Sequence, residues 1–471
     1  MKSELRTPAS IPTLHLQVNY LAVLMVLCCL FSACSTKNPE RTNFLIMIAD
    51  DQRWDQLGCA DNPVIPELKT PNIDKLASDG VYFRNTFIPS PICAVSRACI
   101  QTGMYESTHG MNHFNTPIET DILDKTYPAL LHENGYRTGM LGKWGMGEAG
   151  TERIFDVFNA WYHQGPYFHE TDSGRIHNSQ WLADRAREFF ESNEEGVPFC
   201  LTICFKSPHH PYQPDPRDEN LFENVEIPKR RTDTPEDYEK MARHIMDSSL
   251  NRWCYFDERR DEATKNDFEK NFLRCVVSLD RAVGEVMKSL GDFDFDSNTV
   301  VFYISDHGYM WGEHGLGGKW LLYEESIKVP MIIKDPDLPG KFTGTKLDQL
   351  ALNIDIAPTI LDMAGIPLPE MMDGISLAPL LKNSSQKTRD DFFMEHVGVI
   401  DVENPIPDSR GVRTEEWKYI RYVNVDPEVE EIYNIRIDPF ETDNLINDPE
   451  YINVKEDLLK RYMEYMESFE K

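Results

Sequence analysis

The stretch NFLIMIA at residues 43–49 is an unbroken apolar run, and a second run, TVVFYIS, occupies residues 299–305. Both runs are short, suited to β-structure and followed by aspartate. Such runs are typical of central strands in a sheet that helices cover on both faces. Residues 137–142, 199–205 and 329–333 have a similar character, so the sequence predicts a sheet with several buried strands.

Helical stretches are predicted between these strands, at residues 73–79, 126–134, 178–194 and 265–290. In the last of them, apolar residues recur at helical spacing, which indicates packing against the core. Strands that alternate with helices predict an α/β fold with a large, mostly parallel sheet flanked by helices.

The pattern changes from about Arg389 onward. Residues 392–396, 411–414 and 417–422 are predicted to form short antiparallel strands, and residues 451–467 to form a closing helix. A tight turn joins the last two of these strands. The end of the chain is therefore expected to be a smaller unit with α+β character.

Three segments follow from these patterns. Residues 1–34 are predicted to be a targeting segment, residues 40–388 a large α/β domain, and residues 389–471 a smaller C-terminal α+β subdomain. Within the large domain, the acidic, proline-containing stretch 215–237 is expected to be a long surface excursion near a site.

The targeting segment contains an apolar run at residues 21–31, which is too short to span a bilayer and has the length of a signal peptide's hydrophobic region. It ends in Phe-Ser-Ala-Cys at residues 31–34, which resembles a bacterial lipobox. We therefore predict lipidation of Cys34 and export to the periplasm or outer membrane of a Gram-negative bacterium. The lipid anchor would be the contact with the membrane. A plain secretory signal with an incidental cysteine is the alternative.

The chain of 471 residues has a formal net charge of −30 at pH 7. Binding to nucleic acid requires a basic face that neutralises phosphates, so this charge argues against a nucleic-acid partner. It also means that an anionic substrate has to be held by a local basic cluster.

The cysteines do not resemble a disulfide framework. The chain has 10 of them, of which three lie in the first 34 residues. Large domains do not need such a framework. Cys200 and Cys204 lie inside an apolar run and are predicted to be buried free thiols.

Acidic residues follow both of the strongest predicted strands, at the strand ends where ligands bind in α/β sheets. Asp50 and Asp51 follow the first strand, and Asp306 and His307 follow the second. Each pair alone is also explained by a helix cap or a turn. Two pairs at equivalent strand ends predict a site for one divalent cation. Ligands rich in oxygen favour calcium or magnesium over zinc.

A third element is the segment SPICAVSRA at residues 90–98. It places Cys93 and, four residues later, Arg97 at the predicted start of a helix. A thiol and a cation near a helix N-terminus favour the binding of an anion.

This segment, continued by Thr102 and Gly103, resembles the signature C-x-P-x-R…TG of the type I sulfatases, within the alkaline phosphatase superfamily. The resemblance covers almost the whole mature chain, because further motifs follow in the family's order. They lie at residues 70–77, 142–144, 207–209, 305–308, 318–320, 323–326 and 433–445.

The resemblance implies an alkaline phosphatase-like fold and a sulfuric ester hydrolase. It implies that Cys93 is oxidised to formylglycine by a formylglycine-generating or an anaerobic sulfatase-maturing enzyme. One hydroxyl of the hydrated aldehyde would attack sulfur and the other would expel sulfate, which splits one hard step into two. One calcium ion would lower the pKa of this nucleophile. Its expected ligands are Asp50, Asp51, Asp306, His307 and the modified Cys93.

The same resemblance implies roles for basic residues. Arg97 would stabilise the ionised diol, and Lys143 and Lys319 would hold the sulfate oxygens. His209 would protonate the departing alcohol. Each of these residues also has an ordinary explanation as a surface, ion-pair or loop residue.

Two residues depart from the family pattern. Val95 stands where the signature usually has proline, which makes conversion of Cys93 less favourable. Gly145 stands where the family often has histidine after Gly-Lys-Trp. The sequence therefore predicts that another histidine or water assists sulfate release, or that turnover is slow.

The expected substrate is a sulfated carbohydrate, because an exported lipoprotein of this family resembles bacterial enzymes that desulfate glycans. Candidates for contacts with the sugar are His210, His314, His396 and Arg413, although Arg413 also fits a solvated strand position.

Two other functions stay open. A phosphate or phosphonate ester hydrolase of the same superfamily would use the same metal site. A glycan-binding lipoprotein that keeps the fold without catalysis is less favoured, because the residues expected to act in catalysis are present together.

Overall fold

The computed structural model describes residues 41–470, apart from residues 115, 149, 173, 260, 399–402 and 404. The predicted signal peptide, with its apolar run and Cys34, lies outside the described residues. Within the described part of the chain, no helix is both long enough and apolar enough to cross a lipid bilayer.

The two apolar runs form neighbouring strands in the middle of a large sheet. They are β1 (Asn43–Ala49) and β8 (Thr299–Ser305), and every residue of both is buried. The strands pair in parallel, from Asn43 opposite Thr299 to Ala49 opposite Ser305. Both strands therefore end at the same edge of the sheet, where the predicted acidic residues follow them.

The order of the strands in the large sheet is β12, β2, β11, β8, β1, β7, β3, β4, and β13 pairs with β2. The pairings from β8 through β4 are parallel, whereas β11 is antiparallel to both β8 and β2. The prediction of a mostly parallel sheet is confirmed. The bounds are β2 (Val81–Phe87), β3 (Arg137–Lys143), β4 (Val157–Trp161), β7 (Phe199–Cys204), β11 (Lys328–Lys334), β12 (Thr345–Leu347) and β13 (Ala351–Leu352).

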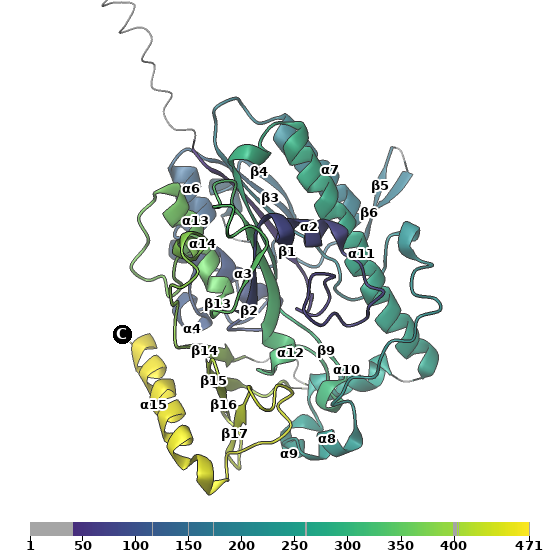
Figure 1. Cartoon of the computed structure of the whole chain (residues 1–471), viewed down its shortest axis with the longest axis vertical. Helices are drawn as coiled ribbons and strands as arrows, with labels where there is room; N and C mark the ends of the chain where they lie inside the picture. Colours follow the sequence, from purple (N-terminus) through teal and green to yellow (C-terminus); the bar gives the residue numbers. More distant parts are fainter. Residues whose placement is uncertain are drawn as a thin grey trace, which may run out of the picture. The chain divides into compact units, whose positions relative to one another are not determined.

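Helices cover both faces of this sheet, as the sequence predicts (Figure 1). Phe44, Ile46 and Ile48 of β1 pack into one apolar cluster, and Leu45 and Met47 pack into another. Alternate residues of a strand point to opposite faces, so β1 contributes to the core on both sides. The first cluster includes α3 (Cys93–Thr102), α6 (Tyr127–Glu133) and α13 (Ile356–Ala364), and the second includes α2 (Pro71–Asp79), α7 (Asn178–Glu191) and α11 (Glu262–Asp292).

Shorter elements connect these layers. The predicted excursion at residues 215–237 holds only a short 3-10 turn and the start of α8. The cysteines that the structure describes are free, and Cys200 and Cys204 are buried as predicted.

The other helices are α4 (Glu106–His109), α5 (Thr120–Leu123), α8 (Pro235–Glu239), α9 (Arg243–Met246), α10 (Leu250–Glu258), α12 (Glu324–Ile327) and α14 (Ala378–Lys382). Two small hairpins pair β5 (Phe168–Thr171) with β6 (Gly174–His177) and β9 (Met310–Trp311) with β10 (Gly317–Gly318). The 3-10 turns are Thr151–Arg153, Pro216–Asp218, Asp296–Asn298, Glu313–Gly315, Asn353–Asp355 and Pro449–Tyr451.

The C-terminal part is a small antiparallel sheet against which the closing helix packs. Its strands pair in the order β14, β15, β16, β17. Tyr419 of β16 and Leu458 and Tyr462 of the helix share one apolar cluster. The bounds are β14 (Asp391–His396), β15 (Ser409–Thr414), β16 (Trp417–Tyr422), β17 (Val429–Asn434) and α15 (Ile452–Phe469).

One buried lysine connects this small sheet to the segment that follows β10. Lys418 of β16 donates a hydrogen bond to the carbonyl of Leu322 at 3.0 Å. Its ammonium also lies 2.9 Å from Glu324 and 2.5 Å from Glu441. The Lys418 side chain is fully buried. Glu441 depends on it for charge compensation, and Glu324 is compensated by Lys418 together with Arg413.

We predict that Lys418→Met lowers the midpoint of thermal unfolding by several degrees. Removing one partner of a buried ion pair costs about 3–5 kcal/mol, because the remaining charge is buried without compensation. The control is Lys75→Met. Lys75 pairs with Asp79 at 2.8 Å, but its side chain is 72% exposed, so its loss should cost less than about 1 kcal/mol. Equal midpoints for the two variants would contradict the role given to Lys418.

Candidate active site

Backbone hydrogen bonds at the ends of β1 and β8 bring the predicted acidic residues together. Asp306 N donates to the carbonyl of Ala49 at 3.0 Å. Asp51 N donates to Asp306 Oδ1 at 3.2 Å, and Asp50 N donates to Ser207 O at 3.2 Å. Asp51 has a φ of 74°, a left-handed conformation that aspartate adopts more readily than most residues. The chain therefore turns sharply and presents successive carboxylates to one buried space.

Cys93 begins α3 and faces these strand ends. Its Sγ lies 3.1 Å from His307 Nε2 and 3.2 Å from Lys319 Nζ. The residue is only 1% exposed. The thiol therefore lies inside the cluster of carboxylates and basic groups, at the N-terminus of a helix of 10 residues, where the helix dipole favours negative charge.

Arg97, one turn further along α3, holds the site together. Its Nη2 and Nε donate to Asp306 Oδ2 at 2.8 and 3.1 Å, and its Nη1 donates to the carbonyl of Lys143 at 2.7 Å. Asp50 Oδ2 lies 3.6 Å from Nη2. The guanidinium thus compensates the carboxylates that follow both central strands.

Two lysines pair with the successive aspartates. Lys143, the last residue of β3, donates to Asp50 Oδ2 at 2.7 Å. Lys319, just after β10, donates to Asp51 Oδ1 at 2.6 Å. All four side chains are buried, so these ion pairs are screened little by solvent.

The cluster shifts the pKa values of its members in different directions. Burial acts to raise the pKa of Asp50, but the cations Lys143, Arg97 and Lys319 hold it well below its usual range. For Asp51, burial outweighs the attraction of Lys319 and His307 and raises the pKa to about 7. Burial also raises the pKa of the Cys93 thiol. An unmodified Cys93 is therefore a poor nucleophile at neutral pH, because the thiolate is the reactive form.

His209 lies at the border of this cluster. Its Nδ1 donates to the carbonyl of His210 at 2.8 Å, since a carbonyl only accepts. Its Nε2 lies 3.8 Å from Asp51 Oδ2 and 3.4 Å from the side-chain nitrogen of Gln164. Burial and the nearby Lys319 lower the pKa of His209 well below its usual range, against the attraction of Asp50.

The residues predicted to contact a sugar lie in different surroundings. His210 is exposed, and its ring meets Tyr212 edge-on. His314 is buried and stacks on Tyr323 at 4.9 Å. His396 is buried in β14, and Arg413 is buried and donates to Glu324 Oε1 at 3.1 Å. Arg413 is therefore not the solvated strand residue that the sequence allows.

The sequence patterns did not predict Lys206 and Gln164 as residues of the site. Lys206 follows β7 and is 5% exposed, and its ammonium donates to the carbonyl of Gln164 at 3.3 Å. Both residues contact the segment that carries His209. The only sequence signal was the position of Lys206 directly before the Ser-Pro-His motif at 207–209.

The donor set fits a divalent cation. One ligand atom from each of Asp50, Cys93, Asp306 and His307 lies within 4.8 Å of the others. Asp50 Oδ1 is buried and has no hydrogen-bond partner in the described part of the chain. A buried carboxylate oxygen is normally satisfied, and calcium prefers oxygen ligands of this kind.

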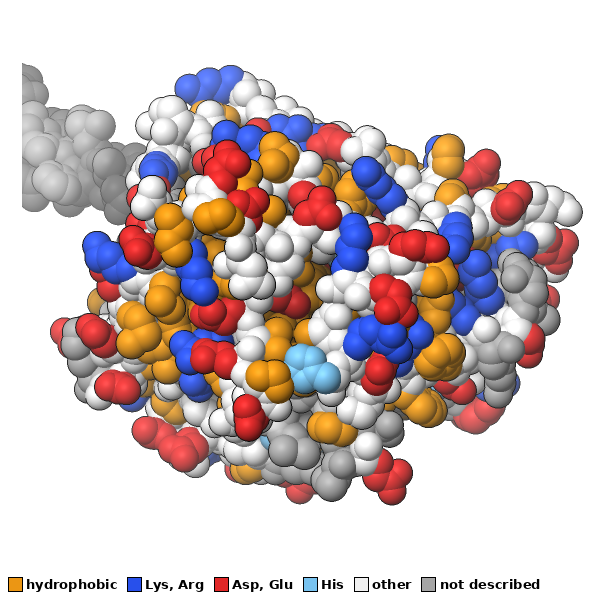
Figure 2. Space-filling model, turned by 90° about the horizontal axis from the view of Figure 1, so that it is seen from below, with side chains coloured by type: hydrophobic (Ala, Val, Ile, Leu, Met, Phe, Trp, Pro, Cys, Tyr) orange, Lys and Arg blue, Asp and Glu red, His pale blue; other side chains and the backbone are white. Residues whose placement is uncertain are grey.

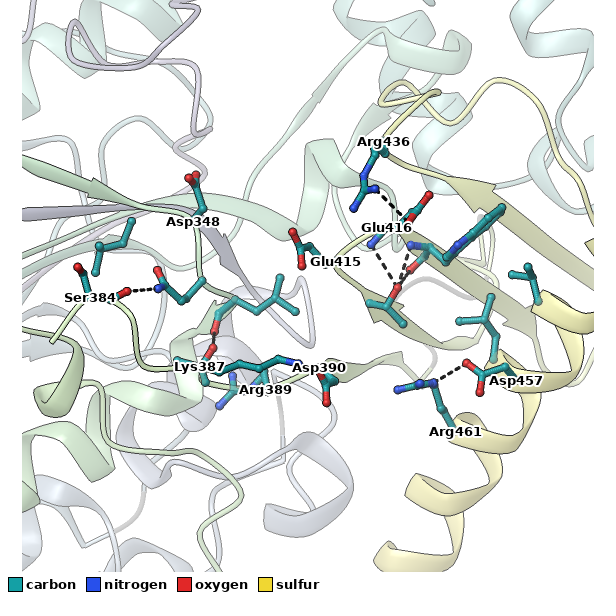
Figure 3. Close-up of a pocket in the computed structure, with 18 of the residues that line it drawn as sticks. Asp348, Ser384, Lys387, Arg389, Asp390, Glu415, Glu416, Arg436, Asp457 and Arg461 are labelled. Atoms are coloured by element: carbon teal, nitrogen blue, oxygen red, sulfur yellow. Dashed lines mark hydrogen bonds and ion pairs between the residues drawn. The ribbon is translucent and has the colours of Figure 1, made fainter.

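The face seen in Figure 2 has Lys and Arg side chains interspersed with Asp, Glu and hydrophobic side chains. A separate cavity of about 960 Å³ lies between the edge of the large sheet, the turn between β15 and β16, and α15 (Figure 3). Charges that line it pair with one another, as Lys387 does with Asp390 and Arg436 with Glu416. It does not include the residues of the cluster around Cys93.

Comparisons with known proteins agree with this geometry. Residues 42–366 match the sulfatase family. The chain belongs to the sulfatase family. Residues 312–468 of this sulfatase match a second family model, described as N-sulphoglucosamine sulphohydrolase, C-terminal.

Related sulfatases are known from bacteria and mammals. An N-acetylglucosamine-6-O-sulfatase of Bacteroides thetaiotaomicron is 27% identical, over 91% of this chain and 88% of the relative. The human N-acetylglucosamine-6-sulfatase is 30% identical, over 78% of this chain and 68% of the relative.

Two solved structures share the fold. One is a protein in complex with its substrate D-glucosamine-2-N,6-O-disulfate, with a TM-score of 0.78 and 25% identity over 91% of this chain and 98% of that one. The other is the phosphonate monoester hydrolase of Agrobacterium radiobacter, with a TM-score of 0.76 and 19% identity over 91% of this chain and 96% of that one. The second likeness concerns the fold alone.

Proposed function

We propose that this sulfatase removes sulfate from carbohydrates, with residue 93 as formylglycine and with one calcium ion. The observation that carries the proposal is the buried cluster in which Cys93 lies 3.1 Å from His307 and 3.2 Å from Lys319. Relatives that act on glucosamine sulfates support the choice of a sulfated sugar.

Formylglycine at position 93 would supply a hydrated aldehyde, whose hydroxyl is a better nucleophile than the buried thiol. The raised pKa of the Cys93 thiol supports this assignment, because an unmodified residue would stay protonated. The position of residue 93 at the start of α3 favours the ionised form of a nucleophile, since the helix dipole is positive there.

Calcium would be held by Asp50, Asp51, Asp306 and His307 together with residue 93, and it would supply positive charge beside the sulfate oxygens. Arg97 keeps Asp306 in place through two hydrogen bonds. Asp50 Oδ1, which has no hydrogen-bond partner among the residues that the structure describes, supports this ligand set.

Lys143 and Lys319 bind the sulfate oxygens in this proposal. Each already contacts an aspartate of the ligand set, and Lys319 Nζ also lies 3.2 Å from Cys93 Sγ, so both ammonium groups lie beside the proposed metal site. Buried ammonium groups placed in advance stabilise the charge that develops on sulfate in the transition state.

His209 is the proton donor to the departing sugar oxygen. Because Nδ1–H is committed to the carbonyl of His210, Nε2 is the nitrogen available to the substrate. Burial keeps His209 neutral in the free protein, and the negative charge of a bound sulfate ester favours its protonated form.

A phosphonate or phosphate ester hydrolase is the second candidate. A phosphonate monoester hydrolase shares the fold, and the buried lysines beside Asp50 and Asp51 can bind a phosphoryl oxygen as well as a sulfate oxygen. The relative turnover of an aryl sulfate, an aryl phosphate and a phosphonate monoester separates the two functions. The proposal also includes export as a lipoprotein, which the apolar run at 21–31 and the sequence ending at Cys34 support.

We predict that Cys93 is found as formylglycine when the protein is produced with a converting enzyme. The tryptic peptide should be lighter by ~18 Da, the difference between a thiol and an aldehyde side chain, as covalent catalysis through this residue requires. Full activity of a protein that contains only the unmodified thiol would contradict the mechanism. Production without converting enzyme is the matched control.

We predict that calcium restores turnover to chelator-treated protein and raises its thermal midpoint, because a ligand that binds only the folded state stabilises it. At a calcium concentration of about 100 Kd the gain should be about 2.7 kcal/mol. Asp51→Ala should lose both responses. Asp348→Ala, which removes a carboxylate with 68% exposure, should keep them. A stoichiometric zinc ion in active protein that ignores calcium would count against the assignment.

We predict that His209→Ala lowers turnover of a sulfated sugar by ~10²–10⁴-fold, the usual size of a general-acid contribution. Turnover of nitrophenyl sulfate should fall much less, since a nitrophenol leaves without a proton. Lys319→Ala is the control and should slow both substrates about equally, because it contacts the sulfate that they share. If His209→Ala also slows both equally, His209 binds substrate and another group donates the proton.

A further inference from the structure

Lys206 differs from the other lysines near the cluster. It is 5% exposed, yet within the described chain its ammonium has no carboxylate partner and makes one hydrogen bond, to the carbonyl of Gln164 at 3.3 Å. The ring of Tyr167 lies 5.1 Å from Nζ. An ammonium has three N–H donors, so two of them are left for another group. Lys143 and Lys319, in contrast, each pair with an aspartate.

A buried charge without a partner is costly, because water no longer solvates it. Lys206 therefore does not add to the stability of the fold, and we expect it to serve in binding. Burial lowers its pKa, and the attraction of Asp50 opposes that shift. An anion that binds next to Lys206 would compensate its charge.

The position of Lys206 decides which part of a substrate it faces. Its carbonyl accepts a hydrogen bond from His209 N at 2.9 Å, so Lys206 begins the turn that presents His209. His209 contacts the oxygen between sulfate and sugar in the proposed mechanism. The Lys206 ammonium is bonded to Gln164, and the Gln164 side chain contacts Nε2 of His209, the atom offered to that oxygen. Lys206 and Gln164 therefore lie beside the position at which the sugar joins the sulfate.

Gln164 adds an acceptor beside this cation. Its side-chain nitrogen lies 3.4 Å from His209 Nε2. Its side-chain oxygen is buried and has no hydrogen-bond partner among the described residues. Tyr167, three residues later, donates its hydroxyl to the carbonyl of His209. Lys206, Gln164 and Tyr167 each make a polar contact in this region, so their polar groups hold defined positions next to His209.

We propose that Lys206 and Gln164 form a subsite for a second anionic group of the substrate, carried either by the sugar with the scissile sulfate or by the sugar joined to it. Lys206 binds the anion, and Gln164 accepts a hydrogen bond from a hydroxyl or amide next to it. The anion is an oxyanion, either a second sulfate or a carboxylate. The overall charge of −30 repels anionic sugars, so a local cation facing the sugar has to provide their selection. This inference rests on the proposed function.

The test measures binding separately from turnover. Protein with Cys93→Ala, which lacks the nucleophile, is titrated by calorimetry with three probes. The first is N-acetylglucosamine-6-sulfate, the second is glucosamine-2-N,6-O-disulfate, and the third is a 6-sulfated N-acetylglucosamine joined to a uronic acid. Each titration is repeated with Lys206→Met added, and with Lys75→Met added as the control for a lost positive charge at an exposed site.

We predict that Lys206→Met weakens binding of a doubly anionic probe by ~10–100-fold, the range expected for a hydrogen bond to a charged group. The singly sulfated probe and the Lys75→Met control should change little. A loss confined to the disulfate identifies sulfate as the second anion, and a loss confined to the uronate probe identifies carboxylate. An equal loss for all three probes, or no loss for any, overturns the subsite.

Turnover of the same probes by the unsubstituted, converted protein separates this inference from the proposed function. If no sulfated sugar is hydrolysed, the proposed function fails. If sugars are hydrolysed but Lys206→Met leaves KM unchanged for doubly anionic and singly sulfated sugars alike, only the subsite fails. Gln164→Leu should weaken all three probes, because each offers a hydroxyl or amide; unchanged affinity removes Gln164 from the subsite. Thermal midpoints of each variant show that it folds.

Discussion

The carboxylates of Asp50, Asp51 and Asp306 are buried at the ends of adjacent parallel strands, and their mutual repulsion is the constraint on which the site depends. Two like charges about 4 Å apart repel by about 4 kcal/mol at an effective dielectric constant of about 20. The fold offsets this repulsion with Arg97 and with lysines from two other segments. Each of these cations comes from a different element, so the elements must all be in place before the strand ends are stable together.

The same constraint explains why the reactive groups lie together at the ends of β1 and β8. Among the described residues, Oδ1 of Asp50 is buried in this cluster and has no hydrogen-bond partner. The cluster also holds Cys93 between basic groups. In the proposed function, a metal ion would bind this oxygen of Asp50, and an anionic substrate would compensate the added positive charge. The fold alone does not choose between sulfate and phosphonate, since the phosphonate monoester hydrolase shares it.

Much of the fold could be predicted from the sequence because the central strands are continuous apolar runs. β2 was missed, since Arg84 and Asn85 interrupt its apolar pattern, and the antiparallel direction of β11 could not be read from composition. In the site, the residues at strand ends and at the start of α3 followed from position and family resemblance. Lys206 and Gln164 did not, because their meeting depends on two loops that only the folded chain brings together. The burial of Arg413 could not be predicted for a related reason: its partner Glu324 lies 89 residues away.

The ion pairs of Lys418 have a consequence for the order of events during synthesis. Glu324 lies shortly after Lys319, and Lys418 and Glu441 reach it from the last part of the chain. A nascent chain that ends before residue 413 contains every strand of the large sheet, but Glu324 in it has neither Arg413 nor Lys418. The segment that carries Lys319 and Glu324 then lacks the ion pairs that connect it to the C-terminal sheet. Completion of the active site is therefore expected to be among the last steps of folding, after the C-terminal sheet has left the ribosome.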